Sequence, residues 1–188
     1  ATLKAETLAD LIKLAKALEI IDVTAHHWLG LNHMSLGRFD QAIAEEKRAL
    51  ELDPLSLVIN ADLGWVYFNA RRYDEAEAQV RKTLEMDANF FLAHFYLGCV
   101  LKLKGRNAQA IPEFQKAFDL NHDLYALAML GQAYGRNGQT QEARKVLAHL
   151  NEETKSRYVA PYALALALLG LGEKERALAE LERAYQTH

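Results

Sequence analysis

Seven histidines are the most obvious candidates for chemistry, and three of them, His26, His27 and His33, lie within one short segment. A divalent metal ion needs ligands that converge on one point, either one helical turn apart or from two elements. His26 and His27 are adjacent, so on a helix their side chains would point about 100° apart. Asp22, four residues before His26, is expected to precede the helix. The spacing therefore favours histidines that pack within the fold, and it predicts no metal site.

The sequence offers little for covalent or acid–base catalysis. It contains no glycine-rich phosphate loop, no G-x-S-x-G nucleophile elbow and no H-E-x-x-H helix. Cys99 is the only cysteine and has no base partner that the sequence identifies. A small apolar packing role is therefore favoured over a reactive thiol. We expect no enzymatic activity and no cofactor.

Composition narrows the function classes further. The 188 residues are 51% hydrophobic and carry a net charge of -3 with both signs interspersed, so no basic surface for nucleic acid or anionic membranes is expected. No stretch reaches the roughly 18 uninterrupted apolar residues that span a bilayer. No signal peptide is visible, which favours a cytoplasmic location without establishing it. Because the chain opens with Ala1 rather than methionine, we expect an excised piece of a longer protein.

Small residues recur along most of the chain at a fixed period. One glycine series has spacings of 34, 34 and 33 residues, and it consists of Gly30, Gly64, Gly98 and Gly131. An alanine series has spacings of 34, 34, 33 and 34 residues, and it consists of Ala42, Ala76, Ala110, Ala143 and Ala177. A period of about 34 residues with small residues at fixed places is typical of a helix–turn–helix repeat array.

This pattern resembles the tetratricopeptide repeat family, in which a small residue lets the two helices of one repeat cross closely. The resemblance covers an array over residues 23–188, in the units 23–56, 57–90, 91–123, 124–157 and 158–187. It implies an all-α fold, a right-handed superhelical solenoid whose handedness follows from the family and not from the spacing. We predict that the helix pairs break near Gly37, Arg71, Gly105, Gly138 and Gly172. Glu46 departs from the family, because it stands where a large apolar residue is usual.

Residues 1–22 lack the landmarks of a full repeat. Residues 3–20 nevertheless show one apolar stripe of a helix with 3.6 residues per turn, formed by Leu8, Leu11, Ile12, Ala15 and Leu18. We expect a separate amphipathic helix, which is either the second half of a truncated repeat or a cap on the first repeat. Together with ten paired helices, this predicts eleven helices.

The resemblance also implies a concave wall, formed by the first helix of each repeat, that binds partners. Carried over residue by residue, the candidate groove residues are His27, Trp28, Leu31, Met34, Asp62, Trp65, Phe68, Asn69, Phe95, Tyr96, Cys99, Lys102, Tyr125 and Met129. Both tryptophans fall on this wall, and aromatic anchors of this kind are common at interface hot spots. The alternative is that packing between repeats buries part of the same stripe. Solvated outer faces are expected for carboxylates on second helices, such as Glu45, Glu46, Glu75 and Glu77.

One subtype of the family binds the C-terminal carboxylate of chaperones through a clamp of lysine, asparagine and arginine side chains. The matching positions here hold His27, Leu31, Asp62, Leu92 and Tyr96. The clamp is therefore absent, and Asp62 would repel a carboxylate.

We therefore expect a non-enzymatic protein–protein interaction module that binds an apolar peptide or helix in its concave groove, with Trp65 as the central anchor. The alternative is a self-assembly element, whose groove is filled by the chain's own N-terminal helix or by another copy. The expected partner is a protein or peptide, or a second copy in a homo-oligomer, and neither nucleic acid nor a membrane. The repeats also resemble arrays that are attached to bacterial signalling proteins.

Overall fold

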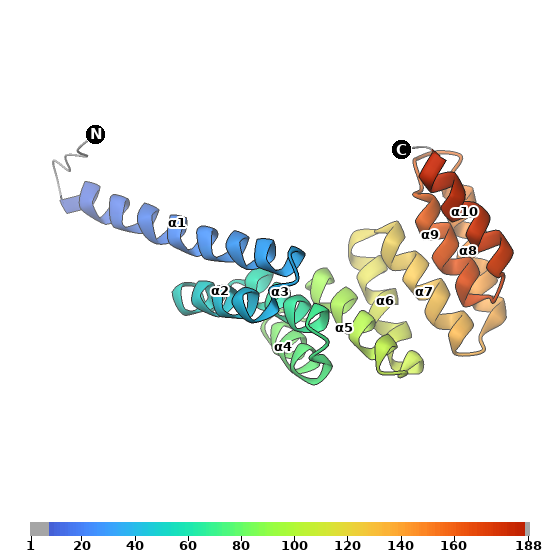
Figure 1. Cartoon of the computed structure of the whole chain (residues 1–188), viewed down its shortest axis with the longest axis horizontal. Helices are drawn as coiled ribbons and strands as arrows, with labels where there is room; N and C mark the ends of the chain where they lie inside the picture. The colour runs from blue at the N-terminus through green and yellow to red at the C-terminus, as the bar shows by residue number, and fades with distance from the viewer. Residues whose placement is uncertain (1–7, 187–188) are drawn as a thin grey trace. The chain divides into compact units, whose positions relative to one another are not determined.

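The computed structural model describes the backbone of residues 8–186 and the side chains of residues 22–186. Within that range it contains ten α-helices and no strand (Figure 1). The helices are α1 (Leu8–Ser35), α2 (Phe39–Leu52), α3 (Leu57–Asn69), α4 (Tyr73–Met86), α5 (Phe91–Leu103), α6 (Asn107–Asn121), α7 (Leu124–Arg136), α8 (Thr140–Glu153), α9 (Pro161–Gly170) and α10 (Lys174–Gln186). The predicted all-α class is confirmed. None of these helices has the length and apolarity needed to cross a membrane.

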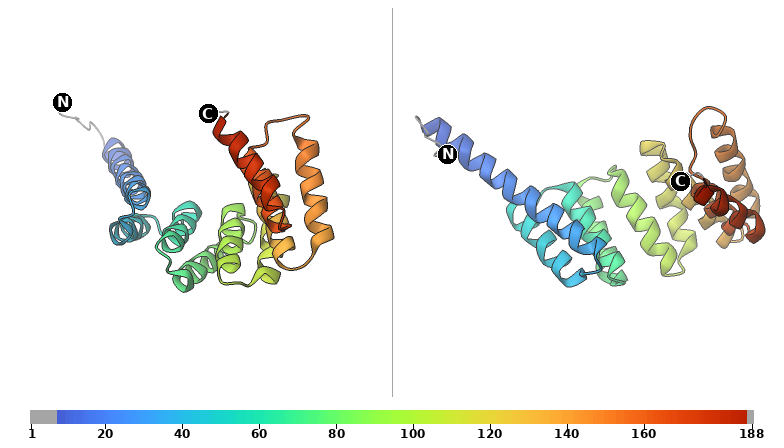
Figure 2. Two further views of the ribbon diagram at one scale, coloured as in Figure 1. Left: turned by 45° about the vertical axis from the view of Figure 1, so that its right-hand side comes forward. Right: turned by 45° about the horizontal axis from the view of Figure 1, so that its top comes forward.

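The chain divides into two compact units, with the boundary between Met86 and Asp87. In the first unit, α1 packs on α2, α2 on α3, and α3 on α4. In the second unit, α5 packs on α6 and α6 on α7, while α7 contacts both α8 and α9, and α9 pairs with α10. Successive helices within each unit form hairpins that lie side by side (Figure 2). Each hairpin corresponds to one predicted repeat.

The expected break between an N-terminal helix and the first repeat is absent. One helix of 28 residues, α1, runs from Leu8 to Ser35, whereas its partner α2 has 14 residues. No glycine or proline precedes Gly30 in α1, so nothing in its sequence ends the helix earlier. The N-terminal part of α1 consequently extends beyond α2 (Figure 1). The described range therefore has ten helices rather than eleven, and a capping role for residues 1–22 stays a prediction.

The hairpin turns occur at the five predicted residues. Positive φ angles of 71°, 74°, 79° and 76° are found at Gly37, Gly105, Gly138 and Gly172. In this left-handed region glycine has no side chain to clash with the backbone, so it commonly ends a helix there. Arg71 occupies the same turn in the second repeat with φ of 61°. The prediction of the helix ends is confirmed.

The periodic glycines lie where the two helices of a hairpin approach most closely. A Cβ atom added at Gly64 would lie 2.5 Å from Cγ2 of Val80, and one added at Gly98 would lie 2.6 Å from Cε1 of Phe114. In the first hairpin the facing side chain is Glu46, whose Oε1 lies 2.6 Å from the corresponding position on Gly30. Only glycine therefore fits these crossings without a shift of the neighbouring side chain.

Candidate functional site

The wall residues of the first unit lie on α1 and α3. Trp28 is the most accessible of them, with 64% of its surface exposed. Trp65 is half-buried and stacks on Phe68, with ring centroids 4.6 Å apart and planes inclined by 9°. The amide of Asn69 donates a hydrogen bond of 2.8 Å to the backbone carbonyl of Trp65. Trp28, rather than the expected Trp65, is therefore the aromatic side chain that a partner reaches most easily.

The remaining wall residues of the first unit are less accessible. Leu31 and Met34 on α1 are half-buried. His27 and Asp62 are each almost enclosed, with side-chain exposures of 13% and 12%. These two residues face each other across the wall, with Nε2 of His27 3.6 Å from Oδ2 of Asp62. The structure thus brings together residues of α1 and α3 that the repeat register only assigned to the same wall.

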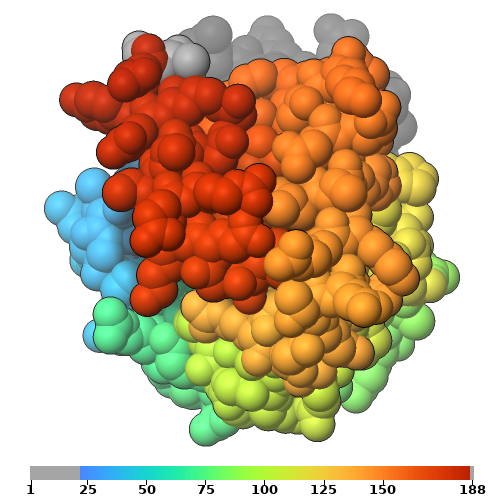
Figure 3. Space-filling model, turned by 90° about the vertical axis from the view of Figure 1, so that its right-hand side faces the viewer, coloured from blue at the N-terminus to red at the C-terminus, as the bar shows by residue number. Residues whose placement is uncertain are grey.

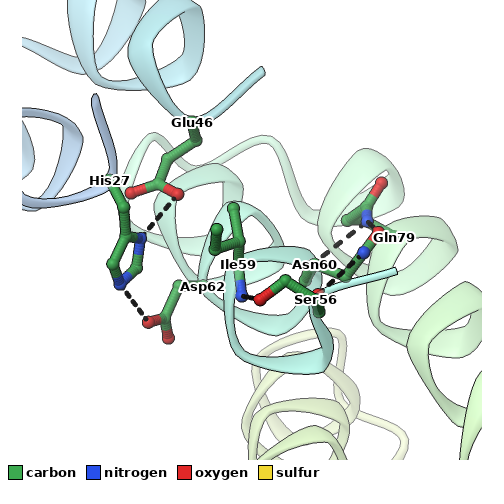
Figure 4. Close-up of polar contacts among 7 residues, drawn as sticks. All are labelled: His27, Glu46, Ser56, Ile59, Asn60, Asp62 and Gln79. Atoms are coloured by element: carbon green, nitrogen blue, oxygen red, sulfur yellow. Dashed lines mark hydrogen bonds and ion pairs between the residues drawn. The ribbon is translucent and has the colours of Figure 1, made fainter. Parts of the chain in front are cut away.

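A cluster of three ionisable groups joins α1, α2 and α3 (Figure 4). His27 lies between Glu46 and Asp62, and its Nδ1 is 3.0 Å from Oε2 of Glu46. The hydrogen bond with Glu46 raises the pKa of His27, although partial burial opposes it. Burial in turn raises the pKa of Glu46, against the opposing effect of His27. The cluster therefore links two repeats through groups that both retain a proton more readily when the protein is folded.

Glu46 is wholly buried, which contradicts the expectation of a solvated outer carboxylate. Its Oε2 contacts His27, but Oε1 has no hydrogen-bond partner and faces Gly30. At the place where the family usually has a large apolar residue, Glu46 thus makes a polar contact with the wall helix α1. Glu75, by contrast, is exposed and Glu45 is half-buried, whereas the side chain of Glu77 is only 12% exposed and pairs with Arg81.

Polar pairs with a constant separation connect the helices of the first three hairpins. Nδ1 of His26 lies 2.5 Å from Oε2 of Glu45, and Nδ1 of His94 lies 2.7 Å from Oε2 of Glu113. In the second hairpin Nε2 of Gln79 donates to Oδ1 of Asn60 at 2.9 Å (Figure 4). Each pair spans 19 residues. His26 and His94 thus serve within the fold, through hydrogen bonds rather than apolar packing.

A pocket of about 410 Å³ opens on the wall of the first unit. Its apolar lining comes from Val23, Leu52, Val58 and Ile59. Its polar lining comes from Thr24, His27, Asp53 and Ser56. Ser56 begins α3 by accepting a hydrogen bond from the backbone N–H of Ile59 at 3.4 Å, which fixes this rim (Figure 4). Sequence reasoning missed the pocket because Leu52, Asp53 and Ser56 belong to the α2–α3 connection and not to a wall helix.

The wall of the second unit has a row of aromatic rings from three successive repeats. The centroids of Phe95 and Tyr125 are 5.5 Å apart, and those of Tyr125 and Tyr162 are 6.0 Å apart. Tyr96 contacts Phe95 with a centroid distance of 6.0 Å and is half-buried. Burial is the main cause that raises the pKa of Tyr125 to about 12. The rings therefore stay neutral and form a largely apolar surface.

Lys102 places a positively charged side chain on the wall of the second unit. Its Nζ donates to Oε1 of Gln132 at 2.7 Å and lies 3.6 Å from Sδ of Met129. Burial lowers the pKa of Lys102. Cys99 and Met129 are buried, so they support this wall from behind and do not present a surface to a partner. Burial also raises the pKa of the Cys99 thiol to about 12, which keeps it protonated and unreactive near neutral pH.

The histidines and carboxylates do not converge on a common ligand position. Among the residues that the structure describes, no group of three or more histidine, cysteine, aspartate or glutamate side chains has the arrangement of a metal site. The three-residue cluster around His27 is an internal hydrogen-bonded contact.

Comparisons with known proteins agree with the repeat pattern. Family models for the tetratricopeptide repeat match residues 33–96, 124–152 and 159–183, together more than half of the chain. A search of curated proteins gave no match.

Several solved structures have a similar fold. The crystal structure of YrrB, a TPR protein with an unusual peptide-binding site, is 26% identical and covers 97% of this chain and 93% of its own, with a TM-score of 0.60. A thermophilic TPR protein in Thermus thermophilus is 21% identical over 87% of this chain and 90% of its own, with a TM-score of 0.71. The MamA protein is 23% identical over 88% of this chain and 91% of its own, with a TM-score of 0.62. Hairpins that match the repeat period, close crossings at the periodic glycines and three family matches lead to one assignment: this chain belongs to the tetratricopeptide repeat family.

Proposed function

We propose that this chain is a non-enzymatic interaction module that binds an apolar peptide or helix on its repeat walls. The observation that carries the proposal is Trp28, which is 64% exposed on the wall of the first unit. Val58 on the neighbouring wall helix is also exposed, at 44%. A rigid aromatic side chain can bury a large apolar area at little entropic cost, so an exposed tryptophan beside other apolar groups is a natural anchor.

The comparisons support this class of function. Proteins with this repeat generally act as scaffolds for other proteins, and YrrB is described as having a peptide-binding site. Each unit, taken by itself, offers an apolar surface to a peptide: Trp28 in the first unit and the Phe95–Tyr125–Tyr162 row in the second. The resemblance of the repeat sequences to arrays attached to bacterial signalling proteins also favours a parent protein of that class.

Selection from a random dodecapeptide library against the full chain tests the proposal. We expect enrichment of peptides with apolar and aromatic residues, and at least tenfold weaker binding of a selected peptide to Trp28→Ala, because hot-spot truncations cost about 2 kcal/mol or more. Tyr185→Ala is the matched control, since Tyr185 is 87% exposed and lies on α10, which is a second helix of its repeat and not a wall helix. Equal binding by wild type and Trp28→Ala would refute the proposal.

Trp65→Ala sharpens the same test. Trp65 is half-buried and stacked on Phe68, so its removal should lower stability as well as binding. Trp28→Ala should leave the unfolding free energy within about 0.5 kcal/mol of wild type, because exposed side chains contribute little to folding. If Trp65→Ala weakens binding while stability is intact, Trp65 is the central anchor after all.

Self-assembly is the second candidate, and the last helix favours it. On α10, Leu178 is 56% exposed and Tyr185 is 87% exposed, and Figure 3 shows α10 on the surface beside α8. Filling of the groove by the chain's own N-terminal helix would need a break in α1, which is continuous. The remaining form is therefore association with a second copy. Light scattering over a range of concentrations tests it: dimers that Leu178→Lys abolishes support it, and a monomer throughout excludes it.

A further inference from the structure

The pocket of the first unit combines apolar walls with polar and charged side chains, which a purely apolar groove would not need. Its volume of about 410 Å³ lies within the range of roughly 300–1,000 Å³ that is usual for ligand sites. Apolar walls come from Val23 on α1, Leu52 at the end of α2 and Val58 on α3. Leu52 and Val58 are both partly exposed, so a partner can reach them. A long side chain with an aliphatic stem fits such a space.

Asp53 places a carboxylate on this pocket. It forms no hydrogen bond or ion pair through its side chain with any residue that the structure describes. At the equivalent place in the next repeat, Oδ1 of Asp87 accepts a hydrogen bond of 2.8 Å from the backbone N–H of Asn89. The side chain of Asp87 thus stabilises its turn, whereas the carboxylate of Asp53 remains available to accept hydrogen bonds from a ligand. Asp53 also follows the last residue of α2, where the helix dipole gives a negative charge no stabilisation.

The described side chains of the two wall helices beside this pocket include no lysine or arginine. From Asp22 onwards α1 contains neither residue, and neither does α3. The positive group of the pocket is His27, which is held between Glu46 and Asp62. With His27 protonated and both carboxylates ionised, these three groups still carry a net negative charge. The pocket and its surroundings therefore attract a cation and repel an anion.

We infer that this pocket receives the lysine or arginine side chain of a bound peptide segment. The inference rests on the proposed groove function and adds the charge class of the partner. The aliphatic stem of the guest would lie along Val23, Leu52 and Val58, as such stems do on apolar surfaces. Its charged head would reach the carboxylate of Asp53 and the hydroxyls of Thr24 and Ser56, which can accept charge-assisted hydrogen bonds.

The alternative guests fit less well. A carboxylate would meet Asp53 with the same charge, and the described side chains of α1 and α3 include no lysine or arginine to offset the repulsion. A purely apolar side chain would remove water from Asp53 without replacing its hydrogen bonds, which is costly for an ionised group. Trp28, with its ring centroid 5.9 Å from that of His27, gives the apolar neighbours of the guest a surface to contact. A cationic residue next to apolar residues is the pattern that satisfies all of these groups.

The same dodecapeptide library, selected against the full chain and against two variants, tests the inference. Wild type should enrich lysine or arginine at one position flanked by apolar residues. Asp53→Asn should lose that preference and keep the apolar one. Asp40→Asn is the matched control and should keep both, because Asp40 lies in the first turn of α2, roughly 20 Å from its C-terminal end. Thermal unfolding of all three proteins checks that each is folded.

A synthetic pair of peptides then gives the magnitude. Replacing the selected lysine or arginine with norleucine should weaken binding to wild type about tenfold, because a hydrogen bond to a charged group contributes about 1.5–3 kcal/mol. The same replacement should change binding to Asp53→Asn less than about twofold.

Each other outcome overturns the inference in a recognisable way. Enrichment of apolar residues alone, with Trp28→Ala still impaired, refutes the cation pocket and leaves the groove function standing. Enrichment of aspartate or glutamate refutes the charge argument. A library that shows no difference between wild type and Trp28→Ala refutes the groove function as well.

Discussion

On the wall helices of the first unit, α1 from Asp22 onwards and α3, the ionisable side chains are acidic or histidine, and lysine and arginine are absent. On the wall helices of the second unit, α5, α7 and α9, the charged side chains are Lys102 and Arg136, and aspartate and glutamate are absent. The wall helices of the two units therefore carry opposite charge, although at different positions of the repeat.

The helix crossings of the two units also differ, in the side chain that faces the crossing glycine. Glu46, Val80 and Phe114 each follow a crossing glycine by 16 residues, and all three are fully buried. The first unit thus has a buried carboxylate where the second has an aromatic ring. The repeat specifies a close helix crossing with a buried side chain facing the glycine, while the chemical type of that side chain varies between repeats. This difference gives four ways to test how each unit is held together.

The largest effect is expected at the aromatic crossing. Phe114→Ala should destabilise the protein by about 3–5 kcal/mol, because the fully buried ring packs on Gly98 and Phe95 and would leave a cavity. Chemical denaturation monitored by circular dichroism measures the change. Phe118→Ala is the control, since Phe118 is only half-buried on the same helix. A loss below about 1 kcal/mol for Phe114→Ala would mean that the second unit does not depend on this crossing.

A smaller effect is expected from overfilling a crossing in the first unit. Gly64→Leu and Ala76→Leu should each cost about 1–3 kcal/mol. A Cβ at Gly64 would already lie 2.5 Å from Cγ2 of Val80, and Ala76 has no exposed surface. Thermal unfolding compares both variants with Ala78→Leu, an exposed position on α4. Unchanged melting temperatures for Gly64→Leu and Ala76→Leu would show that the crossing tolerates bulk.

The repeat period was sufficient to predict the hairpins and their turns. Gly37, Gly105 and Gly138 could be predicted because a left-handed turn strongly selects glycine, so the physical constraint appears directly in the sequence. Arg71 could be placed in the same turn only because its neighbours set the register. The continuous α1 was missed, because the expected boundary came from the repeat pattern, and helix-forming residues cross it without interruption.

The candidate site was predicted less well, for a different reason. The register assigned His27 and Asp62 to the wall, but it could not show that His27 contacts both Asp62 and Glu46. Cys99 and Met129 were assigned to the same wall and are buried, because packing between neighbouring hairpins decides which wall positions stay open. The polar pairs were visible as a constant separation of 19 residues, a signal that the small-residue series obscured.

The third effect is a pH dependence that arises from the buried carboxylate. Both Glu46 and His27 have pKa values raised in the folded state, so the folded protein binds more protons than the unfolded chain. Their contribution to stability is therefore fully present below the ordinary values of 4.5 and 6.5, and it is lost as pH rises through the raised values. We therefore expect the melting temperature to fall as the pH rises above the ordinary values of 4.5 and 6.5.

Glu46→Gln should flatten this dependence, because an amide does not ionise and His27 loses its charged acceptor. Part of the slope should remain through His94, whose pKa is raised, against the effect of burial, by its hydrogen bonds with Glu113 and the carbonyl of Ala88. Glu113→Gln in the second unit is the matched variant and should remove that remainder. Melting temperatures of wild type and both variants, recorded at several pH values, test this expectation. An unaltered pH dependence of the melting temperature in Glu46→Gln would exclude the cluster as its source.

The smallest effect is expected at the turns, where the units differ by one residue. Arg71 adopts φ of 61° in the first unit, and Gly105 adopts φ of 74° at the equivalent turn of the second. A left-handed conformation costs a residue with a side chain about 1–2 kcal/mol, while glycine loses about 0.5–1 kcal/mol more entropy on folding. Arg71→Gly should therefore stabilise the protein by about 0.5–1 kcal/mol, and Gly105→Arg should destabilise it by a similar amount. Chemical denaturation of the two variants and of the double variant measures both changes. Since the two turns belong to different units, the stability changes of the two single variants should add, so the double variant should be nearly as stable as wild type. A stability loss in Arg71→Gly would instead mean that the Arg71 side chain makes a contact that offsets the strain of its backbone.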